Sequence, residues 1–120
     1  MMQDFVPRHA ATLARVKRYG MYRNLMWQNT DVRQRSNATN YALKRIQDAL
    51  KEQNLLNEWV RDWNTFDKVQ PGHFDQALRA LARIETCLDD AWGWMTYDVD
   101  QAAFVFDLNW SSFLYQASKA

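Results

Sequence analysis

The most regular pattern of apolar and polar residues in the chain lies between His73 and Trp92. Apolar side chains recur there at steps of three and four residues: Phe74, Ala77, Leu78, Leu81, Ile84, Leu88, Ala91 and Trp92. At about 100° per residue these positions share one helical stripe. The opposite face carries Asp75, Arg79, Arg83, Thr86 and Asp90. Because Pro71-Gly72 and Gly93 are typical of helix ends, the pattern predicts a central amphipathic helix over 73–92.

A less regular helix is predicted from Arg8 to about Asn29. One of its sides carries Leu13, Val16, Gly20 and Trp27. The opposite side is a basic stripe that carries Arg8, Arg15, Arg18 and Tyr22. Such a stripe is either a solvated helix face or a surface that contacts phosphates. The polar residues 28–40 are predicted to form a basic loop with Arg33 and Arg35, and Ser36 or Asn37 is expected to cap the next helix.

Residues 38–66 follow a helical pattern whose apolar side changes within the segment. Its first half places Leu43, Ile46 and Leu50 on one side. Its second half places Leu56, Trp59, Trp63 and Phe66 nearly opposite. A single straight helix would need apolar contacts on both sides, whereas asparagine tolerates the left-handed conformation that ends helices. We therefore predict two helices, 38–53 and 55–66, with a break at Gln53-Asn54.

Two structures compete after Gly93. Alternating apolar and polar residues over 94–108 are typical of a β-hairpin. A helix over 99–117 would instead form an apolar stripe of Val99, Ala102, Ala103, Phe106, Trp110, Phe113, Leu114 and Ala117. The helix is preferred because an isolated hairpin is marginal in water and the chain offers no other strand. The predicted fold is all-α, with four to five helices around the central helix in a single globular domain, residues 1–120.

Composition adds an excess of large aromatic residues to this prediction. The chain of 120 residues contains six tryptophans, and its aromatic content is 14%. Such side chains build cores and also dominate binding interfaces. No signal-peptide pattern is found near the N-terminus, and the longest wholly apolar run, Ala102 to Phe106, is too short to cross a bilayer. A cytoplasmic protein without a membrane partner is expected.

Charge is distributed unevenly along the chain. Residues 1–60 contain ten Lys/Arg and five Asp/Glu, whereas residues 61–120 contain five and nine. The formal net charge is therefore only +1, although the two halves have opposite signs. Such an asymmetry indicates either a charged partner or docking of one half on the other.

No arrangement of residues in the sequence indicates catalysis or cofactor binding. His9 and His73 are the only histidines and lack the spacing of a metal site with a carboxylate. Cys87 is the only cysteine, so an internal disulfide is excluded and the thiol is expected to behave as a small apolar side chain. The three glycines are isolated, so no phosphate-binding loop is present. We expect a protein that is not an enzyme and has no metal or cofactor.

Glu85 interrupts the apolar stripe of the central helix. Its helical phase places it beside Leu81, Leu88 and Trp92. A carboxylate in such a place must be paired, or its pKa must rise. Glu85 could lie where the stripe is uncovered or at a contact with a second chain, but the preferred prediction is an internal salt bridge to an arginine of the N-terminal segment.

The leading hypothesis is a non-enzymatic binding module that occupies the surface of a partner. A small regulator or inhibitor of a larger protein or nucleoprotein complex fits this description, including inhibitors of the type that phages and mobile elements encode. The alternative is weak nucleic-acid binding by the basic N-terminal half, which an overall pI near 7.9 disfavours. A second copy of the chain is a further candidate partner. The residues expected to contact the partner, because no structural role is evident for them, are Arg15, Arg18, Tyr22, Arg33 and Arg35.

Overall fold

The computed structural model describes residues 2–65 and 71–97 of the chain. These residues form three helices: α1 (Met2–Asn29), α2 (Asn37–Thr65) and α3 (Pro71–Tyr97). The described part contains no strand, so the all-α prediction is confirmed, whereas the prediction of four to five helices is wrong. The helix predicted over 99–117 lies outside the described residues. The alternative hairpin over 94–108 also lies mostly outside them, and its first residues, Trp94 to Tyr97, are helical.

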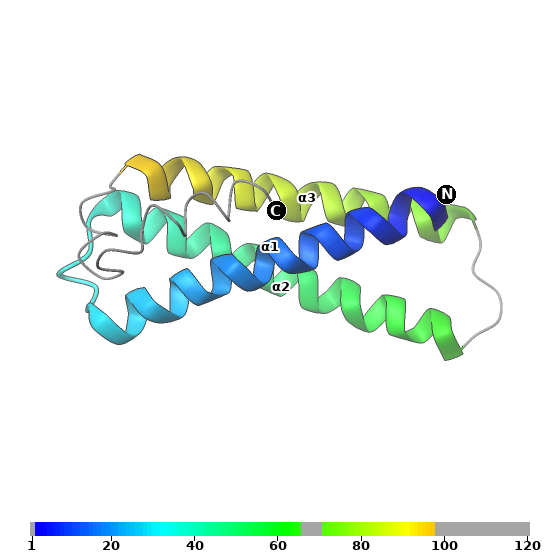
Figure 1. The fold of residues 1–120 in the computed structure, drawn as a ribbon, viewed down its shortest axis with the longest axis horizontal. Coiled ribbons are helices and arrows are strands. Elements are labelled where there is room, and N and C mark those ends of the chain that lie inside the picture. The colour runs from blue at the N-terminus through cyan, green and yellow to red at the C-terminus, as the bar shows by residue number, and fades with distance from the viewer. Residues whose placement is uncertain (1, 66–70, 98–120) are drawn as a thin grey trace.

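The three helices form an elongated bundle (Figure 1), 49 × 25 × 19 Å along its principal axes. Helix α1 crosses α2 at an angle near the middle of both, and α3 lies along the bundle. Helices α1 and α3 run in the same direction and α2 runs opposite to both. The contact between α2 and α3 is the most extensive of the three. The core therefore lies mainly along the α2–α3 pair, with α1 packed across it.

Helix α3 confirms the central amphipathic helix. Its stripe is buried, with Leu81, Ile84 and Leu88 wholly removed from solvent. The predicted polar face is exposed at all five positions. The helix continues past Gly93 to Tyr97, so the predicted end at Gly93 is wrong. Burial of Met95, one turn after Ala91, outweighs the loss of about 1 kcal/mol that glycine causes inside a helix.

Helix α2 is continuous, so the predicted break at Gln53-Asn54 is wrong. The buried side of α2 rotates along the helix because α1 crosses it whereas α3 runs beside it. Where the buried side of α2 changes, small side chains and one amide are buried. These residues are Ala42, Ala49 and Gln53. The side-chain nitrogen of Gln53 donates a hydrogen bond to Asn57 Oδ1 at 2.8 Å, whereas its Oε1 has no hydrogen-bond partner among the described residues.

Helix α1 buries a side that only partly matches the predicted one, because Val16 of the predicted apolar row is buried together with Tyr22 of the basic stripe. Tyr19, Tyr22 and Met26 are in the core, whereas Leu13 is 36% and Trp27 53% exposed. Tyrosine rings bury a large apolar area. Burial of Tyr19, Tyr22 and Met26 therefore removes more apolar surface from water than burial of the row that contains Gly20 would. The helix also begins earlier than predicted, at Met2 instead of Arg8.

The connection between α1 and α2 is shorter than the predicted loop over 28–40. Ser36 caps α2 as predicted, because its Oγ accepts a hydrogen bond from the backbone N–H of Thr39 at 3.2 Å. The Oδ1 atom of Asp31 accepts from the backbone N–H groups of Arg33 and Gln34 at 2.8 and 3.1 Å. These bonds fold the connection into a compact turn.

Gly20→Ala is expected to raise the free energy of unfolding by about 0.5–1 kcal/mol, because alanine is the better helix former. A Cβ at this position would lie 3.9 Å from Leu50 Cδ2, an ordinary van der Waals contact. Urea denaturation followed by circular dichroism measures the change. Gly93→Ala is the matched control, because a Cβ there meets no atom within 4 Å. If Gly20→Ala destabilised the protein and Gly93→Ala did not, α1 and α2 would lie too close together at Gly20 to accommodate a Cβ atom.

Candidate protein-binding surface

Arg15 has a structural role that the sequence analysis did not assign. Its guanidinium donates to Asp89 Oδ1 of α3 at 2.7 Å and to Tyr19 Oη at 3.3 Å. The same guanidinium lies 5.3 Å from the centre of the Tyr19 ring. Only 18% of the Arg15 side chain is exposed. Arg15 therefore covers a buried tyrosine and connects α1 to α3, whatever else it contacts.

The other predicted contact residues fall into two groups. Tyr22 is 1% exposed and belongs to the core, and Arg18, four residues before it, is partly buried. Arg33 and Arg35 lie in the connection between α1 and α2. Arg35 donates to Asn40 Oδ1 at 3.0 Å and to the Thr30 carbonyl at 3.3 Å, so it holds this connection together. Of the five residues, Arg33 alone is exposed.

Glu85 forms the internal salt bridge that the sequence predicts. Arg8 Nε donates to Glu85 Oε1 at 3.0 Å, and Arg8 Nη2 also bonds to Oε1. The hydrogen bond with Glu85 is the main reason why the pKa of Arg8 is raised. The side chains are 40% and 34% exposed, so water reaches the pair. Together with Arg15 and Asp89, this pair accounts for part of the charge asymmetry inside the molecule.

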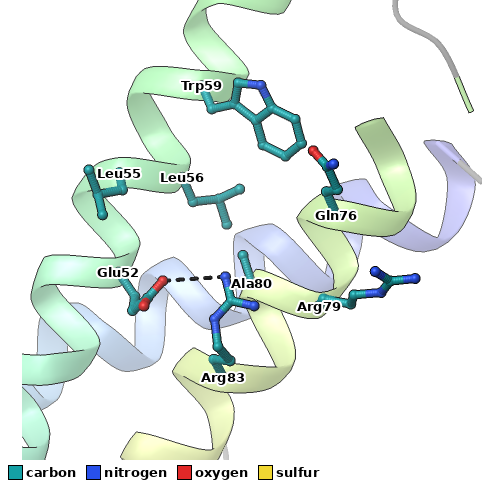
Figure 2. Close-up of a pocket in the computed structure, with 8 residues that line it drawn as sticks. All are labelled: Glu52, Leu55, Leu56, Trp59, Gln76, Arg79, Ala80 and Arg83. Carbon is teal, nitrogen blue, oxygen red and sulfur yellow. Dashed lines mark ion pairs between the residues drawn. The ribbon is translucent and has the colours of Figure 1, made fainter. Parts of the chain in front are cut away.

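A pocket of about 410 Å³ lies between the second half of α2 and the first half of α3 (Figure 2). Leu56 and Ala80 lie at its centre, and Trp59 points across it toward Gln76. Leu55 is 56% exposed at its edge. One end is closed by Arg83, whose Nη2 lies 3.6 Å from Glu52 Oε2. The pocket thus combines an apolar floor with a charged end.

This pocket is one part of a longer depression between α2 and α3, which we call the α2–α3 furrow. The adjoining part, about 560 Å³, shares Glu52 and Arg83 with the pocket and also contains Cys87 and Thr86. A third part, about 300 Å³, continues from Arg45 and Asp48 to the far end. The residues of α2 that line the furrow extend from 41 to 59, which corresponds to about 27 Å at 1.5 Å per residue.

Aromatic side chains mark both ends of the α2–α3 furrow. At one end the rings of Tyr41 and Trp94 lie 5.0 Å apart between their centres. At the other end Trp59 meets the ring of His73 edge-on at 5.8 Å. Tyr41 and Trp94 are both exposed, although they contact each other. Exposed tryptophan and tyrosine of this kind are typical of residues that anchor a bound protein.

The charged residues that line the α2–α3 furrow are mostly basic. Its acidic residues are Asp48 and Glu52, and its basic residues are Lys44, Arg45, Lys51, Arg79 and Arg83. Arg45 is neutralised by Asp48 at 3.1 Å and by Asp90 at 2.9 Å. Within the described residues, Lys44, Lys51 and Arg79 form no ion pair, so the furrow keeps a positive excess.

A second depression, of about 690 Å³, lies between α1 and α2. Leu13, Met21 and Leu50 give it apolar walls, and Lys17 is the only charged residue that lines it. It is larger than any single part of the α2–α3 furrow. It has neither the aromatic ends nor the row of basic residues, so its lining does not indicate the chemistry of a ligand.

Cys87 lies in the α2–α3 furrow but is not an activated thiol. Burial raises the pKa of the Cys87 thiol, and the nearby Arg45 guanidinium offsets only part of this increase. Nucleophilic cysteines need the opposite shift. Among the described residues, no group of three His, Cys, Asp or Glu side chains gathers as metal ligands would.

Raising the pH above about 8.5, where an unfolded thiol ionises, is expected to reduce the stability of the protein. Because the pKa of Cys87 is raised in the folded state, the folded chain retains this proton while the unfolded chain loses it. The contribution of the protonated Cys87 thiol to the free energy of unfolding is fully present below about pH 8.5. Above that pH it decreases by at most about 1.4 kcal/mol per pH unit. Urea denaturation at pH 7.5 and 9.5 measures the loss.

Cys87→Ala provides the control, because this variant has no thiol to titrate. Its loss of stability between pH 7.5 and 9.5 should be smaller than that of the wild type. Equal losses in both proteins would mean that Cys87 ionises as readily in the folded chain as in the unfolded one. Tyr19, whose pKa burial also raises, contributes to any further decline near pH 10.

Sequence reasoning missed most of the α2–α3 furrow. It placed Arg79, Arg83 and Thr86 correctly on the polar face of α3 but did not assign them to a site. The pairing of this face with α2 could not be read from either helix alone. Comparisons of the chain with protein-family models, with curated proteins and with solved structures found no match. None of the helices within residues 2–65 and 71–97 has the length and apolar character needed to span a bilayer.

Proposed function

We propose that this protein is a non-enzymatic binding module that acts by occupying the surface of another protein, as a regulator or an inhibitor does. The observation that supports this proposal most directly is the α2–α3 furrow. It is long and open, with the exposed Tyr41 and Trp94 at one end and the half-buried Trp59 at the other, and Lys44, Lys51 and Arg79 form no ion pair within residues 2–65 and 71–97. Arginine and aromatic residues are the types enriched at protein interfaces.

The alternative function, binding of nucleic acid by the basic N-terminal half, receives less support. Two of the arginines that would contact phosphates, Arg8 and Arg15, are bonded to Glu85 and Asp89. A phosphate would have to displace these carboxylates. We propose that any binding to duplex DNA is weak, independent of sequence and strongly reduced by salt.

Affinity capture from the source cell tests the proposal, with the full chain as bait and Leu55→Asp as the variant. A charge at this exposed position should abolish capture of a specific protein without unfolding the chain. Leu13→Asp is the matched control, because Leu13 is also partly exposed but lines the depression between α1 and α2. It should capture the same protein as the wild type.

Two results would contradict the proposed function. One is that no protein is captured reproducibly by the wild type. The other is that capture disappears after nuclease treatment, which would favour the nucleic-acid alternative. If the wild type, Leu55→Asp and Leu13→Asp captured the same protein equally well, the protein would have a binding function, but the binding surface would not be the α2–α3 furrow.

A further inference from the structure

We infer that the ligand of the α2–α3 furrow is an amphipathic α-helix of a partner protein with acidic residues along its polar face. This inference rests on the proposed function, because it names the class of partner that the same surface would take. It is carried by the shape of the furrow and by the positions of its charges.

The shape of the furrow favours a helix over an extended peptide. Both walls are α-helices, whose backbone groups are already hydrogen-bonded within each helix. An extended peptide would therefore find no sheet edge with which to pair its own N–H and C=O groups. A helix satisfies these groups internally and can pack between two neighbouring helices, as in a four-helix bundle. The furrow length of about 27 Å corresponds to roughly 18 helical residues.

The wall that α3 contributes leaves space for such a helix. Ala80, Ala82, Thr86 and Cys87 line this wall with small side chains. Trp59 and Trp94 stand at the ends, where they can contact apolar residues of the partner, and the Glu52–Arg83 pair lies between them. Small residues in the middle allow helix axes to approach within the usual 8–10 Å.

The positions of the charges favour an acidic partner. Lys44 and Lys51 are seven residues apart on α2 and therefore lie two helical turns from each other on the same side. Arg79 lines the pocket that contains Trp59, and its side chain points away from the Glu52–Arg83 pair (Figure 2). Carboxylates on a bound helix could reach these bases without breaking an ion pair within the described residues. Like charges on a basic helix would be repelled.

An NMR titration tests the inference with two synthetic amphipathic helices of 18 residues. Both have the same leucine and alanine stripe, but one has glutamate and the other lysine on the polar face. The acidic peptide is expected to shift the indole N–H signals of Trp59 and Trp94 in the isotope-labelled full chain. It should bind at least ten times more tightly than the basic peptide and weaken as salt is added.

Charge reversal in the furrow provides the decisive comparison. The double variant Lys51→Glu, Arg79→Glu should weaken binding of the acidic peptide at least tenfold. Arg61→Glu is the matched control, because Arg61 is an exposed base of α2 outside the furrow lining. It should change the affinity less than threefold. Thermal midpoints within a few degrees of the wild type establish that these surface variants remain folded.

Several outcomes would overturn the inference without touching the proposed function. They are equal binding of the two peptides, no binding of the acidic peptide, or an equal effect of Arg61→Glu. Duplex DNA that shifts the same signals at lower concentration than the acidic peptide would identify a general polyanion site instead. Specific capture of a protein through Leu55 would still stand in each of the first three cases, so failure of the partner class is distinguishable from failure of the binding function.

Discussion

Tyr22→Ala is expected to lower the free energy of unfolding by about 3–5 kcal/mol, the usual loss when a buried aromatic side chain is truncated. Tyr22 is 1% exposed and packs in the core with Tyr19 and Met26. Chains of this size are stable by only about 5–15 kcal/mol, so the variant should lose much of its stability. Urea denaturation followed by far-ultraviolet circular dichroism gives the change.

Tyr22→Phe distinguishes the ring from its hydroxyl group. It retains the ring and should cost no more than about 1.5 kcal/mol, the net contribution of a typical hydrogen bond. Arg33→Ala, in the exposed connection before α2, should change stability by less than about 0.5 kcal/mol. If Tyr22→Ala were as harmless as Arg33→Ala, Tyr22 would be a surface residue, as the sequence pattern suggested.

Leu81→Ala is expected to cost about 2–5 kcal/mol, because it removes a wholly buried side chain and leaves a cavity at the centre of α3. The same denaturation measurement applies. Leu55→Ala is the control of the same chemical type, and at 56% exposure it should cost less than about 0.5 kcal/mol. A loss below about 1 kcal/mol for Leu81→Ala would mean that the stripe of α3 is not the core.

The sequence was sufficient to predict α3 and the type of residue that pairs with Glu85, the carboxylate within its apolar stripe. A stripe that is apolar over five turns has only one buried side, so Leu81 and Ile84 could be placed without knowing their neighbours. Glu85 could then be recognised as a carboxylate that needed a cation. The chain offers few basic residues outside its N-terminal half, so an N-terminal arginine was the natural partner.

The sequence was not sufficient where two faces of one helix compete. In α1 the side with Leu13 and the side with Tyr22 are both partly apolar. Packing against α2 and α3 buries the ring of Tyr22 and leaves Leu13 partly exposed. In α2 the change of phase looked like a break because the crossing of α1 cannot be read from a linear pattern. Gln53, where the sequence pattern predicts a helix end, is instead a buried amide inside α2.

The candidate site was harder to predict than the fold. Arg15 looked free because Asp89, its partner, is 74 residues away in the sequence. The α2–α3 furrow was not visible because its two walls come from separate helices, and each wall joins polar residues to the edge of an apolar stripe. Polar sides of this kind show no periodic signal that tells a solvated surface from a binding surface.

The way in which α1 is attached also determines how the native state opens. Helix α1 contacts the other two helices less extensively than these contact each other, and the ion pairs that Arg8 and Arg15 form with α3 are partly exposed. Such pairs contribute at most about 1 kcal/mol each. We therefore expect release of α1 to be the opening of lowest free energy among the described helices, with amide hydrogens of α1 exchanging with solvent before those of α3. In that open state Tyr19 and Tyr22 leave the core together, so its population sets how often a protease reaches α1.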